Sequence, residues 1–234
     1  MQLLVSVSDS NEAAAALAGG ADIIDAKDPA AGPLGAVAID TLRQIGAAVG
    51  AARFVTAAIG DAAEQDGVER TAFAFAAAGA RLVKVGFAGT GDPQHAEALL
   101  RAAIRGASEG CDRCGVVAVA YADADRIASI SPDLLIDAAA TAGASGILLD
   151  TANKSGPGLR GLVSAEALRM WVTRARQRGL MVALAGRLQL DDLDFVREAG
   201  ADVAGVRGAA CDGGRAGRIS VEKVLALRRV CYQP

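Results

Sequence analysis

The chain has little of several features that mark common classes of protein. Its 234 residues include one histidine and four cysteines, and 24 basic residues stand against 27 acidic ones. The net charge of −3 provides no broad basic field for nucleic acid and no polybasic tract for an anionic membrane. We therefore expect neither nucleic acid nor a membrane among its partners.

The sequence also lacks a long apolar run. Its first residues, MQLLVSVSDSNEAAAALAGG, have no positively charged region before the apolar part. Polar or glycine residues interrupt each apolar stretch before it reaches the roughly 18 residues that a membrane span requires. We therefore expect a cytoplasmic protein.

The few cysteines are expected to be reduced thiols, because the chain carries no export signal. Only Cys111 and Cys114, in the stretch CDRC, have the spacing of a redox pair or of half a metal site. A structural zinc site takes about four nitrogen or sulfur ligands, and His95 is the single histidine. We expect no bound metal, and the role of this cysteine pair is left open.

Eight short β-rich runs alternate with helical stretches rich in Ala and Leu, most of which end at glycine, as helix C-termini often do. Strands that are apolar throughout are typical of a parallel sheet covered on both faces. Eight such units in one chain of this length favour an α/β fold, a closed (β/α)8 TIM barrel in a single domain spanning 1–234, over an open doubly wound sheet. The expected strands are 3–7, 22–27, 54–60, 82–87, 115–121, 146–150, 181–186 and 203–208.

Two loops refine this expectation. The first strand is followed by SVSDSNE and not by the glycine-rich G-x-G-x-x-G, which argues against a dinucleotide cofactor. The stretch CDGGRAGR, residues 211–218, has the composition of a flexible loop.

Lysine is scarce, with four residues against 20 arginines, and its placement is not that of surface charge. Lys27 ends the second expected strand, Lys84 lies within the fourth, and Lys154 follows the sixth. Asp25 points to the same side of its strand as Lys27, and Asp150 ends the sixth strand. Because alternate strands of a TIM barrel share a layer and the active site lies at their C-terminal ends, we expect these five side chains to converge.

Lysine suits covalent chemistry where arginine does not, because burial or nearby cations can lower the pKa of its amine toward neutrality. A neutral amine attacks a carbonyl group and forms a Schiff base, while neighbouring carboxylates transfer protons. The alternative is a set of structural Lys–Asp ion pairs at the barrel rim. Three lysines on alternate strands favour the chemical interpretation, since buried charges are rare without a reason.

The loops after the seventh and eighth strands are where TIM barrels often hold phosphate. Backbone N–H groups of Gly186, Gly208 and Ala209 are candidates for binding a substrate phosphate, with Arg187 or Arg207 adding charge. Glycine is also common in loops between a strand and a helix that bind nothing. The residues by themselves thus indicate a Schiff-base barrel that acts on a small phosphorylated carbonyl compound.

Four motifs occur in order along the chain: LLVSV, GGADIIDAKDPAAGPLGA, LVKVGFAG and GILLDTANKSG. With them the chain resembles the family of (5-formylfuran-3-yl)methyl phosphate synthase, also called 4-(hydroxymethyl)-2-furancarboxaldehyde-phosphate synthase, over nearly its whole length. The second motif is the most specific. The resemblance weakens toward CDRC and CDGGRAGR.

The resemblance implies a lyase that condenses two molecules of glyceraldehyde 3-phosphate, a small phosphorylated triose, into a phosphorylated furan aldehyde in methanofuran biosynthesis, a part of one-carbon metabolism. One phosphate and water are lost, and neither an organic cofactor nor a metal is implied. By motif, Lys27 corresponds to the Schiff-base lysine and Lys84 to a proton-transfer lysine. Asp25, Asp150 and Lys154 correspond to supporting positions.

Other interpretations stay open at this point. A class I aldolase, or an enzyme like triose-phosphate isomerase acting on another phosphorylated carbonyl compound, fits the same residues. So does a catalytically silent barrel used for binding, which an exposed Lys27 with an ordinary pKa would favour. A homo-oligomer is compatible with the sequence.

Overall fold

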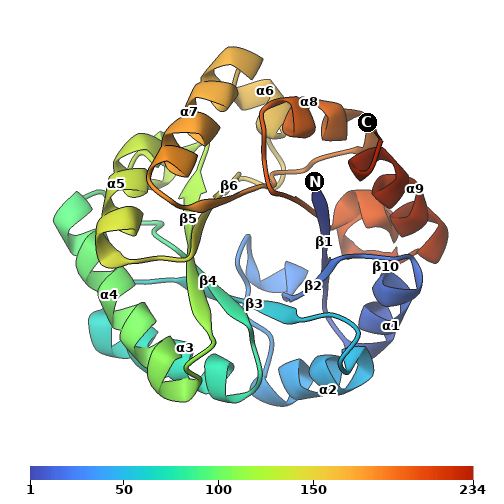
Figure 1. The fold of residues 1–234 in the computed structure, drawn as a ribbon, viewed down its shortest axis with the longest axis horizontal. Coiled ribbons are helices and arrows are strands. Elements are labelled where there is room, and N and C mark those ends of the chain that lie inside the picture. Colours follow the sequence, from blue (N-terminus) through green and yellow to red (C-terminus); the bar gives the residue numbers. More distant parts are fainter. Residues whose placement is uncertain (234) are drawn as a thin grey trace.

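In the computed structural model, which describes residues 1–233, eight parallel strands form a closed barrel with helices around it (Figure 1). Each strand pairs with the next along the chain, and β1 closes the ring by pairing with β8, where Val5 lies beside Val206. The prediction of a TIM barrel is confirmed. The strands are β1 (Gln2–Val7), β2 (Ile23–Ala26), β3 (Val55–Asp61), β4 (Leu82–Gly86), β5 (Gly115–Tyr121), β6 (Gly146–Asp150), β7 (Met181–Leu184) and β8 (Val203–Val206).

The outer layer consists of helices that follow the strands in sequence (Figure 1). The expected and observed strands agree, with ends displaced by at most two residues. None of the helices described within 1–233 has both the length and the apolar character needed to cross a membrane. The helices are α1 (Ser10–Ala18), α2 (Ile39–Val49), α3 (Gln65–Ala77), α4 (Pro93–Gly110), α5 (Pro132–Ala142), α6 (Leu159–Leu162), α7 (Ala165–Gln177), α8 (Leu193–Glu198) and α9 (Val221–Cys231).

Helix α4 illustrates how local sequence builds this layer. The carboxylate of Asp92 caps its first turn by accepting hydrogen bonds from backbone N–H groups, and Pro93 stands at the first helical position. Leu99 and Leu100 lie on its buried face and belong to the hydrophobic core. Gly106 faces α3, and a Cβ atom there would collide with the backbone of Glu69. Glycine at this position therefore lets two neighbouring helices pack closely.

Alternation along each strand separates the barrel interior from the layer beneath the helices. On β2, Ile24 and Ala26 belong to the core between sheet and helices, whereas Ile23 packs inside the barrel. Asp25 has the same orientation as Ile23 and is 0% exposed. The interior is thus apolar at one end and carries charged side chains toward the C-terminal ends of the strands.

The stretch 211–218 is more ordered than its composition suggests, which corrects the expectation of a simple flexible loop. Its ends form an antiparallel hairpin of β9 (Cys211–Asp212) and β10 (Arg218–Ile219). Two side-chain hydrogen bonds hold the turn of this hairpin against the barrel: Arg207 donates to the carbonyl oxygen of Arg215, and Arg215 donates to that of Gly32, 183 positions away. No local sequence pattern reports them. All four cysteines are free thiols.

Candidate active site

A cavity of about 290 Å³ lies at the C-terminal ends of the strands. Its floor is made by apolar side chains of the barrel interior, and charged side chains stand above them. The floor includes Ile23, Leu82, Val117, Leu148, Met181 and Val203, and the charged groups include Lys27, Lys84, Asp150 and Lys154.

Asp25 lies directly behind the cavity wall and holds Lys84 in place. The Nζ atom of Lys84 is 2.5 Å from Oδ1 of Asp25, and both side chains are buried. Ser6 donates a hydrogen bond to Oδ2 of Asp25 at 2.8 Å, and Thr56 donates to Oδ1 at 2.7 Å. These two residues are the register partners of Asp25 on β1 and β3, so the sheet itself brings their hydroxyl groups to the carboxylate. Both oxygens of the buried carboxylate therefore have partners.

A second ion pair stands on β6 and the loop after it. The Nζ atom of Lys154 is 2.6 Å from Oδ1 of Asp150. Burial alone would raise the pKa of Asp150, but the charges of Lys154 and Lys27 and the hydrogen bonds it accepts outweigh burial and hold its pKa below the ordinary value. Asp123 anchors the same loop by accepting hydrogen bonds from the N–H groups of Ala152 at 2.7 Å and Asn153 at 2.9 Å. These hydrogen bonds hold the backbone of the loop that carries Lys154.

Lys27 follows β2 and has a different environment from the other two lysines. Its side chain lines the cavity, the residue is 7% exposed, and it forms no ion pair with any other part of 1–233. Burial lowers the pKa of its amine from the ordinary 10.5 to about 7; the charge of Asp150 opposes this change and the charge of Lys84 adds to it. Near neutral pH a substantial fraction of this amine is therefore unprotonated and nucleophilic.

The loops after β7 and β8 form part of the cavity mouth. Gly186, Arg187 and Gly208 line it. The φ angle of Gly186 is 107°, in a region that favours glycine, and a Cβ atom there would lie only 2.9 Å from Cγ2 of Thr151. Glycine at 186 thus allows the loops after β6 and β7 to approach one another at the edge of the cavity.

Comparison with known proteins identifies the family to which the chain belongs. The profile of the 4-HFC-P synthase family matches residues 3–228. The chain is 40% identical to the (5-formylfuran-3-yl)methyl phosphate synthase of Methanopyrus kandleri, over 97% of this chain and 96% of that protein. It is 38% identical to the synthase of the same name from Methanocaldococcus jannaschii, over 99% and 100% of the two chains. This chain belongs to the 4-HFC-P synthase family.

Solved structures agree with the fold of this 4-HFC-P synthase family member. The 3-hexulose-6-phosphate synthase from Salmonella typhimurium superposes with a TM-score of 0.70 at 18% identity, covering 99% of this chain and 98% of that one. Identity at this level establishes the common fold alone. The family resemblance predicted from the four motifs is confirmed by the full-length relatives.

Most of the candidate site residues of this 4-HFC-P synthase family member lie around the same cavity. Lys27, Lys84, Asp150 and Lys154 line one cavity, and Asp25 reaches it through Lys84. Among the candidate phosphate-binding positions, Gly186, Arg187 and Gly208 also line it. Ala209 is not among the lining residues; its side chain packs against the hydrophobic core.

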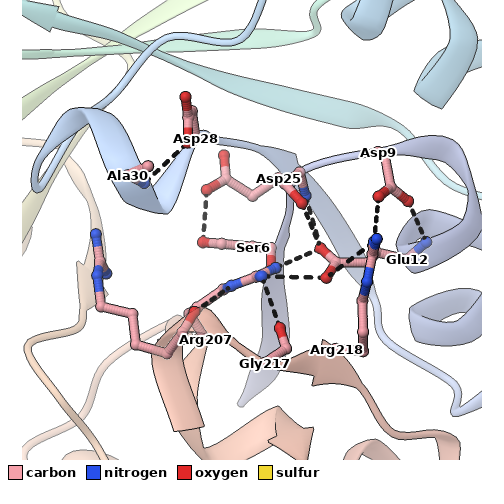
Figure 2. Close-up of polar contacts among 11 residues, drawn as sticks. Ser6, Asp9, Glu12, Asp25, Asp28, Ala30, Arg207, Gly217 and Arg218 are labelled. Carbon is pink, nitrogen blue, oxygen red and sulfur yellow. Dashed lines mark hydrogen bonds and ion pairs between the residues drawn. The ribbon is translucent and has the colours of Figure 1, made fainter. Parts of the chain in front are cut away.

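Arg207 is the candidate that the structure corrects. Its guanidinium group is buried and forms a two-pronged ion pair with Glu12, with Nη1–Oε2 and Nη2–Oε1 distances of 2.5 and 3.1 Å (Figure 2). It also donates to the backbone carbonyl groups of Ser6 and Gly217. With its charge neutralised and its donors occupied, Arg207 joins β8 to β1 and to the hairpin and is not available to a phosphate.

Sequence reasoning missed several residues that shape the site. Ser6 and Thr56 are polar residues within mostly apolar strands. Their polarity could have marked them as partners of Asp25 only with the pairing of β1 and β3 to β2 known. Asp123 and Glu12 act through contacts 29 and 195 residues away in sequence. Arg215 lines the cavity from the hairpin, in the stretch that composition described as a loop.

Proposed function

We propose that the protein condenses two molecules of glyceraldehyde 3-phosphate into (5-formylfuran-3-yl)methyl phosphate through a Schiff base on Lys27, as a carbon–oxygen lyase in methanofuran-type cofactor biosynthesis. Membership of the 4-HFC-P synthase family supports the product. The observation that carries the covalent route is Lys27, an amine that is buried, lines the cavity and has a pKa lowered to about 7.

The first step follows from the chemistry of an amine. The Nζ atom of neutral Lys27 attacks the carbonyl carbon of a triose phosphate, and loss of water leaves an imine. The imine withdraws electrons and makes the neighbouring C–H bond more acidic. We assign the transfer of that proton to Lys84, which pairs with Asp25 and lines the same cavity, both in the isomerisation of one triose phosphate to its ketose and in the condensation.

The later steps need further proton transfers, because furan formation from two triose phosphates releases one phosphate and two waters. Asp150 and Lys154 provide a second acid–base pair on another strand. We assign them to the dehydrations that follow condensation. A simple aldol reaction needs fewer proton carriers than the two lysine–carboxylate pairs supply.

We assign one substrate phosphate to the mouth of the cavity. The backbone N–H groups of Gly186 and Gly208, which line the cavity, are assigned to bind it, with the charge of Arg187 nearby. Ala209, the third candidate, does not line the cavity and is left out of this assignment. The cavity carries three lysines against Asp150 and the Asp25 behind it, so its charge favours an anionic substrate. Free inorganic phosphate is then expected to compete with substrate.

The deciding experiment incubates the purified protein with glyceraldehyde 3-phosphate alone. Ultraviolet absorbance and mass spectrometry are expected to show one furan product, with about one phosphate released per turnover. Borohydride reduction during turnover should label the peptide that contains Lys27, and the label should be absent from Lys27→Arg and retained in Lys223→Arg.

Two results would contradict the proposal. If the wild-type protein gave only dihydroxyacetone phosphate and fructose 1,6-bisphosphate, the aldolase alternative would hold. If furan formed without any label on Lys27, the covalent assignment would be wrong.

A further inference from the structure

The basic side chains at the cavity differ in whether their charge is already neutralised. Lys84, Lys154 and Arg207 are paired with Asp25, Asp150 and Glu12. Lys27, Arg187 and Arg215 also line the cavity, and none of them forms an ion pair with a residue in 1–233. Apart from Lys27, the proposed nucleophile, two arginines thus line the cavity without an ion-pair partner in 1–233.

Arg215 occupies a defined position between two loops. It lies in the turn of the hairpin, within the short 3-10 helix Gly214–Ala216, and is half-buried. Its Nη2 atom donates to the carbonyl oxygens of Gly32 at 2.9 Å and Pro29 at 3.3 Å, in the loop that follows Lys27. These acceptors are neutral carbonyl groups, so the contacts orient the guanidinium group without forming an ion pair.

The buried network of Arg207 fixes the backbone from which Arg215 projects. The Nε atom of Arg207 donates to the carbonyl oxygen of Arg215 at 3.1 Å, and its Nη2 atom donates to that of Gly217 at 3.1 Å. Figure 2 shows Arg207 connecting Gly217 with Ser6 and Glu12. The placement of Arg215 over the cavity is therefore imposed by the barrel and is not a feature of a free loop.

The two unpaired arginines approach the cavity from different sides. Arg187 follows β7, whereas the guanidinium group of Arg215 reaches the loop after β2; β8 and β1 lie between those strands in the ring. Burial lowers the pKa of Arg215 and the charge of Arg207 adds to this, whereas the charges of Asp150 and Asp28 oppose it. An anion bound there would accept hydrogen bonds from the guanidinium group, in place of the water molecules that burial removes.

We propose that Arg215 binds the phosphate of the second triose phosphate, on the side of the cavity next to Lys27, while Gly186, Arg187 and Gly208 hold the first. This inference rests on the proposed function, because that reaction brings two phosphate groups into one cavity. Each carries about −1.5 to −2 charge near pH 7, by analogy with other phosphate monoesters. Two separate cations without carboxylate partners match two such groups.

Titration of the protein with inorganic phosphate, followed by calorimetry, tests the assignment without any turnover. The wild-type protein is expected to bind two phosphates per chain, and Arg215→Gln to bind one. Arg218→Gln is the matched control: Arg218 is on the same hairpin but is exposed and pairs with Asp9, so this variant should keep both sites. Two sites with unchanged affinities in Arg215→Gln would overturn the proposal.

Steady-state kinetics provide the second readout. Arg215→Gln is expected to raise KM for glyceraldehyde 3-phosphate by about tenfold or more, since it removes a charge-assisted contact. Arg215→Lys keeps the charge and should recover part of this loss; equal KM values in the two variants would show that charge is not the cause and would overturn the proposal. If Arg215→Gln did not fold, as judged by circular dichroism, Arg215→Ala, which also removes the charge, would carry the titration, and unchanged affinity at both of its sites would refute the assignment.

The two proposals fail in different ways. A wild-type protein that binds two phosphates but forms no furan from glyceraldehyde 3-phosphate would contradict the proposed function and leave the Arg215 site standing. A wild-type protein that forms furan while Arg215→Gln keeps both phosphate sites and its KM would contradict the Arg215 assignment alone.

Discussion

Lys84 on β4 and Asp25 on β2 form a buried ion pair across β3, with 2.5 Å between Nζ and Oδ1. Neither charged residue lies at the protein surface: Lys84 is 5% exposed and Asp25 is 0% exposed. The hydroxyl groups of Ser6 and Thr56 complete the surroundings of the carboxylate. The pair thus places a fixed amine at the wall of the cavity.

Asp25→Asn should destabilise the fold strongly. The substitution leaves the ammonium group of Lys84 buried without a counter-charge, and breaking a buried pair in this way costs about 3 kcal/mol or more. Urea unfolding measures the change. The control is Asp40→Asn, whose partner Arg43 and own side chain are 62% and 82% exposed, and which should change stability by less than about 1 kcal/mol. Equal effects at the two sites would contradict this account.

Lys84→Arg keeps a positive charge and removes the amine that readily gives up a proton. If Lys84 transfers protons, this variant should lose turnover while Lys27 can still be labelled by borohydride with substrate. Rates of product formation and of labelling separate the two steps. An unaltered rate of turnover would leave Lys84 with an electrostatic role only.

The rate of imine formation should rise with pH and level off above about 7. Protonated Lys27 cannot attack a carbonyl group, and burial lowers its pKa to about 7. The charge of Asp150 raises this pKa, so Asp150→Asn should move the rising limb of the profile to lower pH. Single-turnover labelling across pH 5 to 10 gives both profiles. A limb that continues to rise toward the ordinary pKa of 10.5 would show an unperturbed amine.

Asp150→Asn should also change the products. The variant lacks the second carboxylate assigned to the dehydrations, so condensed but non-aromatic material is expected to accumulate. Mass spectrometry of quenched mixtures detects it. Complete conversion to the furan at the wild-type rate would remove Asp150 from the late steps.

Lys27 should make stability depend on pH in a defined direction. Its folded pKa, about 7, is below its ordinary value of 10.5, so between these values the unfolded chain binds more protons than the folded one. The free energy of unfolding therefore increases as pH rises from about 7 to 10.5. Below about 7, the full cost of burying the protonated amine of Lys27 lowers the stability of the fold. Lys27→Met should be more stable than the wild type at pH 6, with a smaller difference at pH 10. Thermal unfolding at both values measures this, and a difference that grows with pH would contradict it.

The sequence by itself determined the strand and helix order and the side on which key residues lie. Continuous apolar runs separated by glycine-terminated helical stretches predicted the barrel, because parallel strands covered by helices must be apolar on both faces. The two-residue period of a strand placed Asp25 and Lys27 on one side. The scarcity of lysine then directed attention to Lys27, Lys84 and Lys154, which the structure places around one cavity.

Only the tertiary structure decided which arginines retain a free charge at that cavity. Arg207 and Arg187 looked alike in sequence, yet Arg207 is neutralised by Glu12, 195 positions away, and Arg187 has no such partner in the described part of the chain. Arg215 sat in a stretch without strand or helix pattern, and contacts with Pro29 and Gly32 bring it to the cavity. Local spacing reports which way a side chain points, but charge pairing depends on which distant segments the closed barrel brings within a few ångströms of one another.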